Sequence, residues 1–163
     1  MKSEKMMKTE QDAYLTLAAL CAKAEHCQYE MLEKMRRWEL PEEAQARVMQ
    51  RLTEERYVDD ERYARAFVKD KIRYNKWGRL KIDQALWQKR IDFDIRKRVL
   101  DEVDNEEYLS ILRPLLKQKR KSTKANSDYE LNQKLVLFAL GRGFSFDIIH
   151  QCLDVEDEPD DQF

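Results

Sequence analysis

Apolar side chains recur along this chain at intervals of three and four residues, the spacing of a buried stripe on an α-helix. The stripe itself repeats, because segment 29–52 aligns with segment 80–103 at an offset of 51 residues. The aligned apolar pairs are Met31 with Ile82, Met35 with Leu86, Leu40 with Ile91, Ala44 with Ile95, Val48 with Val99, Met49 with Leu100 and Leu52 with Val103. The pattern predicts two copies of one helical unit.

A third copy follows at an offset of 100 residues, with Leu131 and Leu135 in place of Met31 and Met35. Beyond them the offset becomes 104, and the matching apolar residues are Phe144, Ile148, Cys152 and Leu153. Four extra residues add about one helical turn, so the middle helix of the third copy should be longer. We therefore expect an all-α fold of three tandem three-helix (helix-turn-helix-like) repeats, stacked into an elongated, curved body.

The three predicted repeats occupy residues 12–58, 59–104 and 105–153. Their helices are expected at 12–25, 28–38 and 42–55, then at 60–75, 79–89 and 93–103, and finally at 105–121, 128–141 and 145–153. Residues 1–11 and the acidic tail 154–163 flank these repeats and are expected to be disordered.

Local signals support several helix boundaries. Pro41 suits the first position of a helix, and the run Ser127–Glu130 has the Ser-x-x-Glu form of a capping box. Gly143 follows the long helix 128–141, and Ser145 can cap the next one. Pro114 lies within the helix 105–121 and is expected to kink or divide it.

Composition agrees with helices and adds a charge pattern. Charged residues make up 39% of the chain, which has only three glycines and three prolines and a net charge of −1. Residues 60–121 nevertheless carry 18 Lys and Arg against 11 Asp and Glu, and residues 154–163 carry six acids and no base. A basic middle and an acidic end indicate contact with a polyanion or regulation by charge.

Several classes of function are disfavoured. Three cysteines without a CxxC pair and two histidines make a metal site improbable, and Cys21 and Cys152 are interpreted as reduced core residues. No catalytic motif or phosphate-binding glycine loop is present, so we predict no catalytic residue, no cofactor and no enzyme activity. No window resembles a membrane span or a secretory leader, which makes the cytoplasm the expected location.

The most informative candidate surface lies on the helix predicted at 60–75. With 100° between successive residues, five cations fall within an arc of about 80°, and no acid is among them. Two interpretations stay open: a solvated face, or a surface that meets phosphate or an acidic partner. The five residues are Arg62, Arg65, Lys69, Arg73 and Lys76, and Tyr63, Ala64, Phe67 and Tyr74 lie opposite, with Lys71 as the one cation on the apolar side.

The segment that follows extends this candidate surface. Trp77 stands among cations, beside Gly78 and close to Arg79 and Lys81. The indole could stack on a base or enter a partner pocket, or it could fill the junction between helices, and both readings stay open. The runs 96–98 and 117–121 add positive charge, and a flexible basic loop is the alternative interpretation of the second run.

The segment Arg56-Tyr57-Val58-Asp59-Asp60-Glu61-Arg62-Tyr63-Ala64 resembles the Gly-Tyr-Leu-Asp-Asp-x-Arg-Phe-Ala signature of the RecX regulatory protein family. Gly78-Arg79-Leu80-Lys81-Ile82 with Leu86 is similar to the family's Gly-x-x-Arg/Lys-Ile and following Leu, and Lys89-Arg90-Ile91 to its Lys-Gly-Ile. Arg56 and Arg90 stand where the family usually has Gly, which leaves the turn geometry open. A helix cap explains Asp59 and Asp60 without any partner, and we favour that interpretation.

The resemblance implies three tandem three-helix repeats and a function as a modulator, usually an inhibitor, of the RecA recombinase. On this reading the protein lies in the groove of the RecA–DNA filament and limits filament extension, ATP hydrolysis and strand exchange in recombination and DNA repair. We expect a monomer with RecA as its partner and DNA as an accessory contact. The alternative is a stand-alone helical DNA-binding module that uses the basic face of the second repeat.

Overall fold

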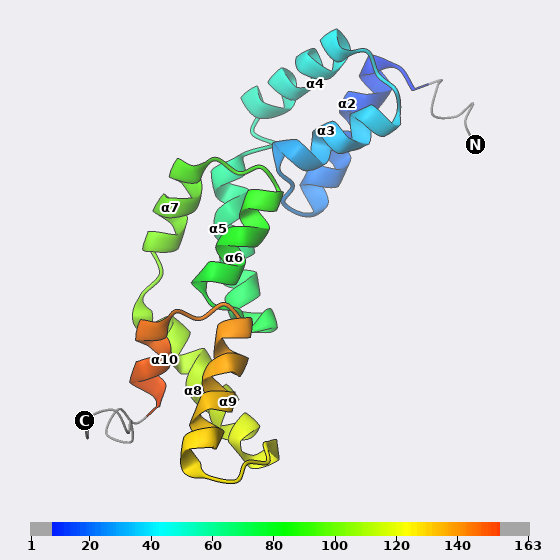
Figure 1. The fold of residues 1–163 in the computed structure, drawn as a ribbon. Coiled ribbons are helices and arrows are strands. Elements are labelled where there is room, and N and C mark those ends of the chain that lie inside the picture. Colours follow the sequence, from blue (N-terminus) through cyan, green and yellow to red (C-terminus); the bar gives the residue numbers. More distant parts are fainter. Residues whose placement is uncertain (1–7, 154–163) are drawn as a thin grey trace. The chain divides into compact units, whose positions relative to one another are not determined.

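The computed structural model describes residues 8–153, and every regular element in this range is a helix (Figure 1). The predicted all-α fold of three-helix repeats is confirmed. Repeat 1 contains α2 (Glu10–Lys23), α3 (Gln28–Arg37) and α4 (Glu42–Glu54). Repeat 2 contains α5 (Asp60–Asp70), its π-helical continuation η1 (Lys71–Asn75), α6 (Arg79–Gln88) and α7 (Phe93–Asp101). Repeat 3 contains α8 (Asn105–Ser122), α9 (Asp128–Gly141) and α10 (Phe146–Cys152). The expectations for residues 1–7 and 154–163 lie outside the described residues.

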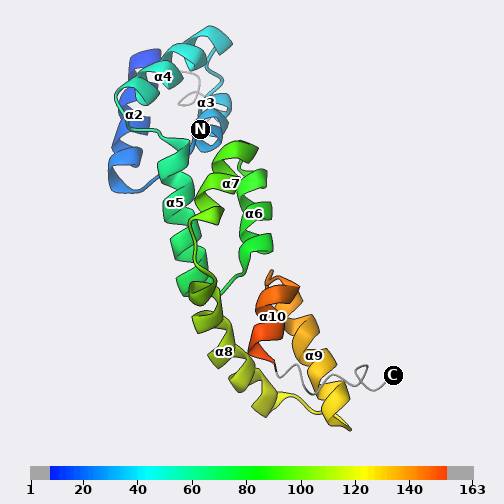
Figure 2. The ribbon, with the colours of Figure 1, turned by 90° about the vertical axis from the view of Figure 1, so that its left-hand side faces the viewer.

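The chain forms two compact units, and the boundary between them passes through repeat 2. The first unit contains the residues up to Ala66 together with 86–96, and the second contains 67–85 and the residues from Lys97 onward. Within the first unit, α2 and α3 both pack on α4. Within the second, α8 packs against both α9 and α10, as Figure 2 shows.

Burial follows the repeat register derived from the sequence. Met35, Leu86 and Leu135, which occupy the same position of the three middle helices, are fully buried. The apolar residues that follow each middle helix, Leu40 and its equivalents Ile91 and Phe144, are buried as well. Each repeat therefore encloses apolar side chains at the same register positions, and the extra turn of α9 is accommodated between Leu135 and Phe144.

Short polar side chains start the helices as their residue types suggest. Thr9 accepts a hydrogen bond from the Asp12 amide, so α2 begins at Glu10, two residues before the predicted start. Ser127 caps α9 by accepting from the Glu130 amide. The Glu130 carboxylate accepts in turn from the Asn126 amide, one residue earlier than in a standard capping box.

Pro114 does not divide the helix in which it lies. α8 runs without interruption from Asn105 to Ser122. A proline at this position removes the hydrogen bond to the carbonyl of Ser110, and both Ser110 and Pro114 are exposed. Water can satisfy the freed carbonyl there. Of the two expected outcomes, a kink or a division, the division does not occur.

The same turn closes all three middle helices. The amides of Leu40, Ile91 and Phe144 donate to the carbonyls of Met35, Leu86 and Ala139, five residues back, at 3.2 Å in each case. The residue before each of these amides has a left-handed backbone, with φ of 61° at Glu39, 61° at Arg90 and 92° at Gly143. This is the Schellman arrangement, which usually places glycine at the left-handed position.

A fourth turn of this kind follows α4, where the Tyr57 amide donates to the Leu52 carbonyl and Arg56 has a φ of 64°. Arg56 and Arg90 are the two positions at which the sequence departs from the glycine of the family pattern. The structure shows that both arginines adopt the glycine-like conformation, so the turn geometry is retained at a conformational cost of about 1 kcal/mol each.

Candidate macromolecule-binding surface

The five cations of the predicted row do not form one unpaired surface, because two of them pair with carboxylates in the first unit. Arg62 donates from Nε to Glu25 Oε2 at 2.7 Å and from Nη2 to the Arg56 carbonyl at 3.0 Å. Arg65 Nη2 lies 2.9 Å from Glu61 Oε2, one turn earlier on α5. The expectation that no acid accompanies this row was therefore wrong for Arg62 and Arg65, which mainly stabilise the first unit.

The start of α5 explains the two aspartates of the signature. Asp59 Oδ1 accepts from the Arg62 amide at 3.0 Å, as an N-cap does. Asp60 Oδ1 accepts from the Gln28 amide at 2.9 Å and thereby joins α5 to the first turn of α3. Burial raises the pKa of Asp60 above its ordinary value. Both carboxylates are thus used within the protein.

Lys69, Arg73 and Lys76 form the remaining part of the row, in the second unit. All three are exposed, and none forms an ion pair with a carboxylate anywhere in residues 8–153. Three cations without a neutralising acid make a surface suited to a polyanion or to an acidic partner.

The backbone beneath these cations departs from the helix that was predicted. Residues 71–75 form a π-helical turn instead of continuing the α-helix to residue 75, and Lys76 ends it with a left-handed backbone, φ 58°. A wider turn rotates each residue by less than 100°, so angles assigned from α-helical spacing fail beyond Asp70. Tyr74 shows the consequence: it was expected on the apolar face and is 71% exposed.

Trp77 is partly buried between two lysines. Lys71 Nζ lies 5.4 Å and Lys81 Nζ 5.0 Å from its ring centroid, and Lys71 Nζ is also 5.1 Å from the centroid of Phe67. Such contacts are cation–π interactions, each of about 0.5–1 kcal/mol at an exposed site. Lys71, which the sequence singled out only as an exception on the apolar side, therefore belongs to this cluster.

Arg79 is paired with a carboxylate. Its Nη2 lies 2.8 Å from Asp101 Oδ1, and Lys97 Nζ lies 2.7 Å from Oδ2 of the same carboxylate. The hydrogen bonds from Lys97 and Arg79 hold the pKa of Asp101 below its ordinary value. Of the predicted site residues, the second unit thus contributes Lys69, Arg73 and Lys76 as unpaired cations and brings Trp77 and Lys81 together.

Another surface was not anticipated from the sequence. A groove of about 630 Å³ in the first unit is lined by two exposed aromatic rings, Trp87 and Phe93, and by Arg90 and Arg96. The Arg96 guanidinium lies 5.6 Å from the Phe93 centroid. Aromatic residues and arginine are the residue types enriched where proteins bind one another. These four lie within ten residues of one another, and the turn between α6 and α7 brings them together.

Within residues 8–153, no group of three His, Cys, Asp or Glu side chains is placed to hold a metal ion. In the same range, no helix is both long and apolar enough to cross a membrane.

Two family models match the chain. The RecX second three-helix domain matches residues 59–100, and the RecX third three-helix domain matches residues 106–153. The chain belongs to the RecX family. The two RecX domains fall within the predicted second and third repeats.

Curated RecX relatives extend beyond the matched region. A regulatory protein RecX from Lactobacillus gasseri is 30% identical over 141 residues, which cover 82% of this chain and 51% of that protein. One from Clostridium acetobutylicum is 34% identical over 128 residues, which cover 76% of this chain and 59% of that protein. The chain therefore spans roughly half the length of these RecX relatives.

Solved RecX structures share the fold. RecX from Lactobacillus salivarius superposes with a TM-score of 0.79 at 21% identity, over 88% of this chain and 93% of that one. A second regulatory protein RecX gives a TM-score of 0.80 at 20% identity, over 91% and 72% of the two chains. At these identities the likeness establishes the RecX fold alone.

Proposed function

We propose that this protein is a non-catalytic regulator that binds the RecA–DNA filament and inhibits its extension, its ATPase and its strand-exchange activity in recombination and DNA repair. It works in the cytoplasm as a monomer, with RecA as partner and DNA as an accessory contact. Membership of the RecX family, whose curated members are regulatory proteins, supports the class of function.

The observation that carries the mechanism is the unpaired set Lys69, Arg73 and Lys76, next to the Trp77 cluster. Cations already neutralised within a protein add little to attraction, whereas unpaired ones attract phosphate and release counterions on binding. An aromatic ring beside them adds contact area at low entropic cost. A filament of RecA on DNA presents both phosphate and protein surface, so this combination suits it.

The test is the DNA-dependent ATPase of RecA from the same organism, measured with the purified chain at substoichiometric amounts. Wild type should slow hydrolysis, and the triple variant Lys69→Glu, Arg73→Glu and Lys76→Glu should lose at least tenfold in apparent affinity. The matched control, Lys117→Glu, Arg120→Glu and Lys121→Glu, carries the same change in charge on exposed positions of α8. Equal inhibition by the two triple variants and wild type would reject the mechanism.

The alternative, a stand-alone DNA-binding module, rests on the same cations and predicts a different result. Binding to bare DNA should then stay tight at physiological salt, and removing three phosphate contacts should lower the slope of log affinity against log salt by about 3. Weak binding that disappears as salt rises leaves DNA as the accessory contact proposed here.

A further inference from the structure

Successive repeats meet through one kind of joint, and the first example lies within the first unit. The start of α3 in repeat 1 contacts the turn that closes the middle helix of repeat 2. Cys27 Sγ lies 3.9 Å from the Lys89 carbonyl, Glu30 accepts from Lys89 Nζ at 2.9 Å, and the Arg90 guanidinium lies 5.3 Å from the centroid of Tyr29. The turn 89–91 is therefore docked on the N-terminal half of α3.

The second example lies within the second unit, and the residues are equivalent in register. The start of α6 contacts the turn that closes α9, because the Gly78 amide donates to the Arg142 carbonyl at 2.8 Å and the Leu80 amide to the Gly143 carbonyl at 3.0 Å. Gly78 corresponds to Cys27 at the offset of 51, and Arg142 corresponds to Lys89 in the repeat alignment. Both joints thus seat one repeat's turn on the previous repeat's middle helix.

Two halves of such a joint remain open in the part of the chain that the structure describes. One is the receiving face of α9 in repeat 3. In repeat 1, the equivalent face carries Tyr29, Leu32 and Arg36, and Arg90 and Asp92 of repeat 2 form the other side of its groove. On α9, a groove of about 460 Å³ lies over the corresponding Tyr129, Asn132 and Val136, and repeat 3 alone lines it.

This receiving face is apolar and exposed. Tyr129 is 54% exposed and Leu137 68% exposed, and Phe146 borders the same groove. Exposed apolar side chains gathered in one groove, in place of single ones scattered over the surface, mark a site of contact.

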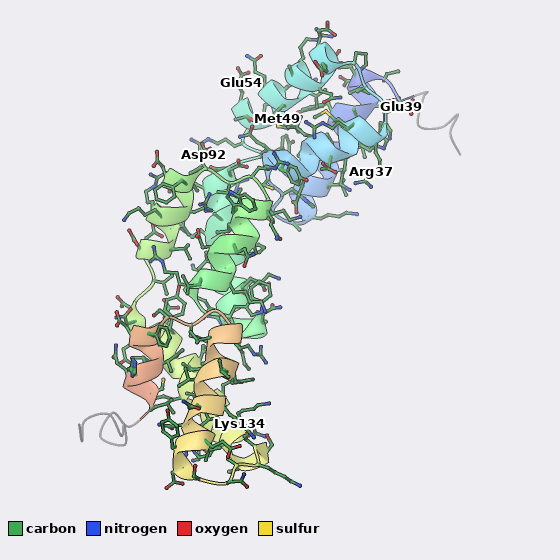
Figure 3. The ribbon with its side chains drawn as sticks, viewed as in Figure 1. Arg37, Glu39, Met49, Glu54, Asp92 and Lys134 are labelled. Carbon is green, nitrogen blue, oxygen red and sulfur yellow. The ribbon has the colours of Figure 1, made fainter. Side chains whose placement is uncertain are left out.

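The other open half is the turn that closes α3, formed by Trp38, Glu39 and Leu40, of which Glu39 is exposed while Lys8 Nζ lies 4.3 Å from the Trp38 ring centroid. It has the same hydrogen bonds and left-handed backbone as the two docked turns. Arg37 precedes this turn and is exposed. Figure 3 shows Arg37 and Glu39 at the C-terminal end of α3 in repeat 1, and Lys134 on α9 in repeat 3.

The charges at the two open halves are complementary. The last turn of α3 is basic and contains Lys34, Arg36 and Arg37. The first turn of α9 is acidic, with Asp128 and Glu130. Glu130 is equivalent to the Glu30 that pairs with Lys89 in the first joint, and it lies 3.3 Å from Lys134 of its own helix, so Asp128 is the acid that remains available. Basic and acidic ends that approach one another are attracted, and like ends are repelled.

We infer that repeat 3 of one copy receives the repeat 1 turn of a second copy, so that chains associate head to tail through the joint already used twice inside each chain. Ser127, which stands at the position of Cys27 and Gly78, then faces the Trp38 carbonyl of the second copy. Such a contact is heterologous, and each added chain leaves a new open end, so growth does not stop at a dimer. The inference goes beyond the proposed function and does not depend on it.

The test is sedimentation velocity on the full chain without RecA or DNA, from about 5 to about 500 μM, a range that covers dissociation constants of weak specific contacts. Wild type should be a single chain at the low end and should gain mass at the high end without a plateau at the dimer. Tyr129→Glu with Leu137→Glu opens the receiving face to solvent and places an acid beside Glu39, which has the register position of the Arg90 that contacts Tyr29 in the first joint. Arg36→Glu with Arg37→Glu alters the inserted turn. Each double variant should weaken association at least tenfold.

Mixing the two double variants makes the test specific. One variant keeps an intact turn and the other an intact receiving face, so an equimolar mixture should form a dimer and nothing larger. Leu15→Glu is the matched control, because Leu15 is 54% exposed on α2 and lies outside both halves; it should associate as wild type does. Circular dichroism must show unchanged helix content in every variant.

Three results would overturn the inference: a constant mass of wild type up to 500 μM, association of either double variant at wild-type strength, or a mixture that grows beyond the dimer. Association that survives both double variants would indicate another interface, such as the aromatic groove of the first unit. None of these results bears on RecA inhibition, which is measured separately.

Discussion

Glu30 and Lys89 form an ion pair of 2.9 Å between the middle helix of repeat 1 and the turn that closes the middle helix of repeat 2. The same carboxylate lies 3.0 Å from His26 Nδ1, accepts from the Cys27 amide and accepts from the hydroxyl of Tyr63 at 3.4 Å. Burial alone would raise the pKa of Glu30, but the hydrogen bond and charge of Lys89 together with these contacts hold it below its ordinary value of 4.5. The pair is thus a polar centre of the first joint.

The first prediction concerns acid stability. Because the folded-state pKa of Glu30 is depressed, its contribution is complete above the unfolded pKa of 4.5 and is lost as pH falls through the lower folded value. Glu30→Gln should cost about 1–2 kcal/mol of unfolding free energy at neutral pH and should flatten the loss of stability below pH 4.5. Urea titrations between pH 3 and 7 measure both effects.

Lys89→Met tests the contribution of the same ion pair to stability at alkaline pH. The hydrogen bond that Lys89 donates to Glu30 raises the pKa of Lys89, so the contribution of the pair is complete below the ordinary value of 10.5 and is lost as pH rises through the higher folded value. If Glu30→Gln and wild type have the same midpoints across the acid range, the pair does not stabilise the joint.

The second prediction concerns the left-handed turns. Arg56→Gly should raise the unfolding free energy by about 1 kcal/mol, because glycine adopts positive φ without the clash of a Cβ atom. Arg56→Ala removes the side chain and keeps the clash, so it separates the backbone effect from any loss of charge. Thermal melting of both variants should show a higher midpoint for glycine only; equal midpoints would contradict the account of the turn.

The third prediction compares two glycines. A Cβ on Gly78 would lie 2.4 Å from Phe144 Cα, whereas a Cβ on Gly141 would meet nothing within 4 Å. Gly78→Ala should therefore force the joint between repeats 2 and 3 apart and cost more than about 2 kcal/mol. Gly141→Ala should be neutral or should stabilise α9 by up to about 1 kcal/mol, and urea midpoints of the pair report the difference.

The fourth prediction concerns the order of thiol reactivity. Burial raises the pKa of Cys27 to about 11, and Cys27 is fully covered in the first joint. At pH 8 it should react with iodoacetamide only after unfolding, whereas Cys21 and Cys152, which are partly exposed, should react in the folded protein. Mass spectrometry of timed digests gives the order, and early labelling of Cys27 would show that the joint opens readily.

The repeats could be derived from the sequence because the apolar register is strong and local. Met35, Leu86 and Leu135 occupy one position of that register and are all fully buried. The caps at Ser127 and Ser145 follow from residue type and short-range hydrogen bonding in the same way. Burial and capping of this kind are decided within one or two helical turns.

The binding surface could be derived only in part, because its details depend on contacts between residues far apart in the chain. Glu25 reaches Arg62 across 37 residues, and no helical projection of α5 contains it. The π-helical turn at 71–75 breaks the periodicity on which the projection of Arg73, Tyr74 and Lys76 was based. The sequence located the cations, but tertiary packing decided which of them are neutralised.

The turns after the middle helices carry a consequence for how such proteins diversify. Backbone hydrogen bonds, identical in all three copies, impose the bend, and the side chain at its apex is an acid in one copy, a base in another and a hydrogen atom in the third. Mutation can therefore change the charge at the left-handed position of each turn at a small cost in stability, while the fold is retained. Homologous chains can in this way share one scaffold and still select different neighbours.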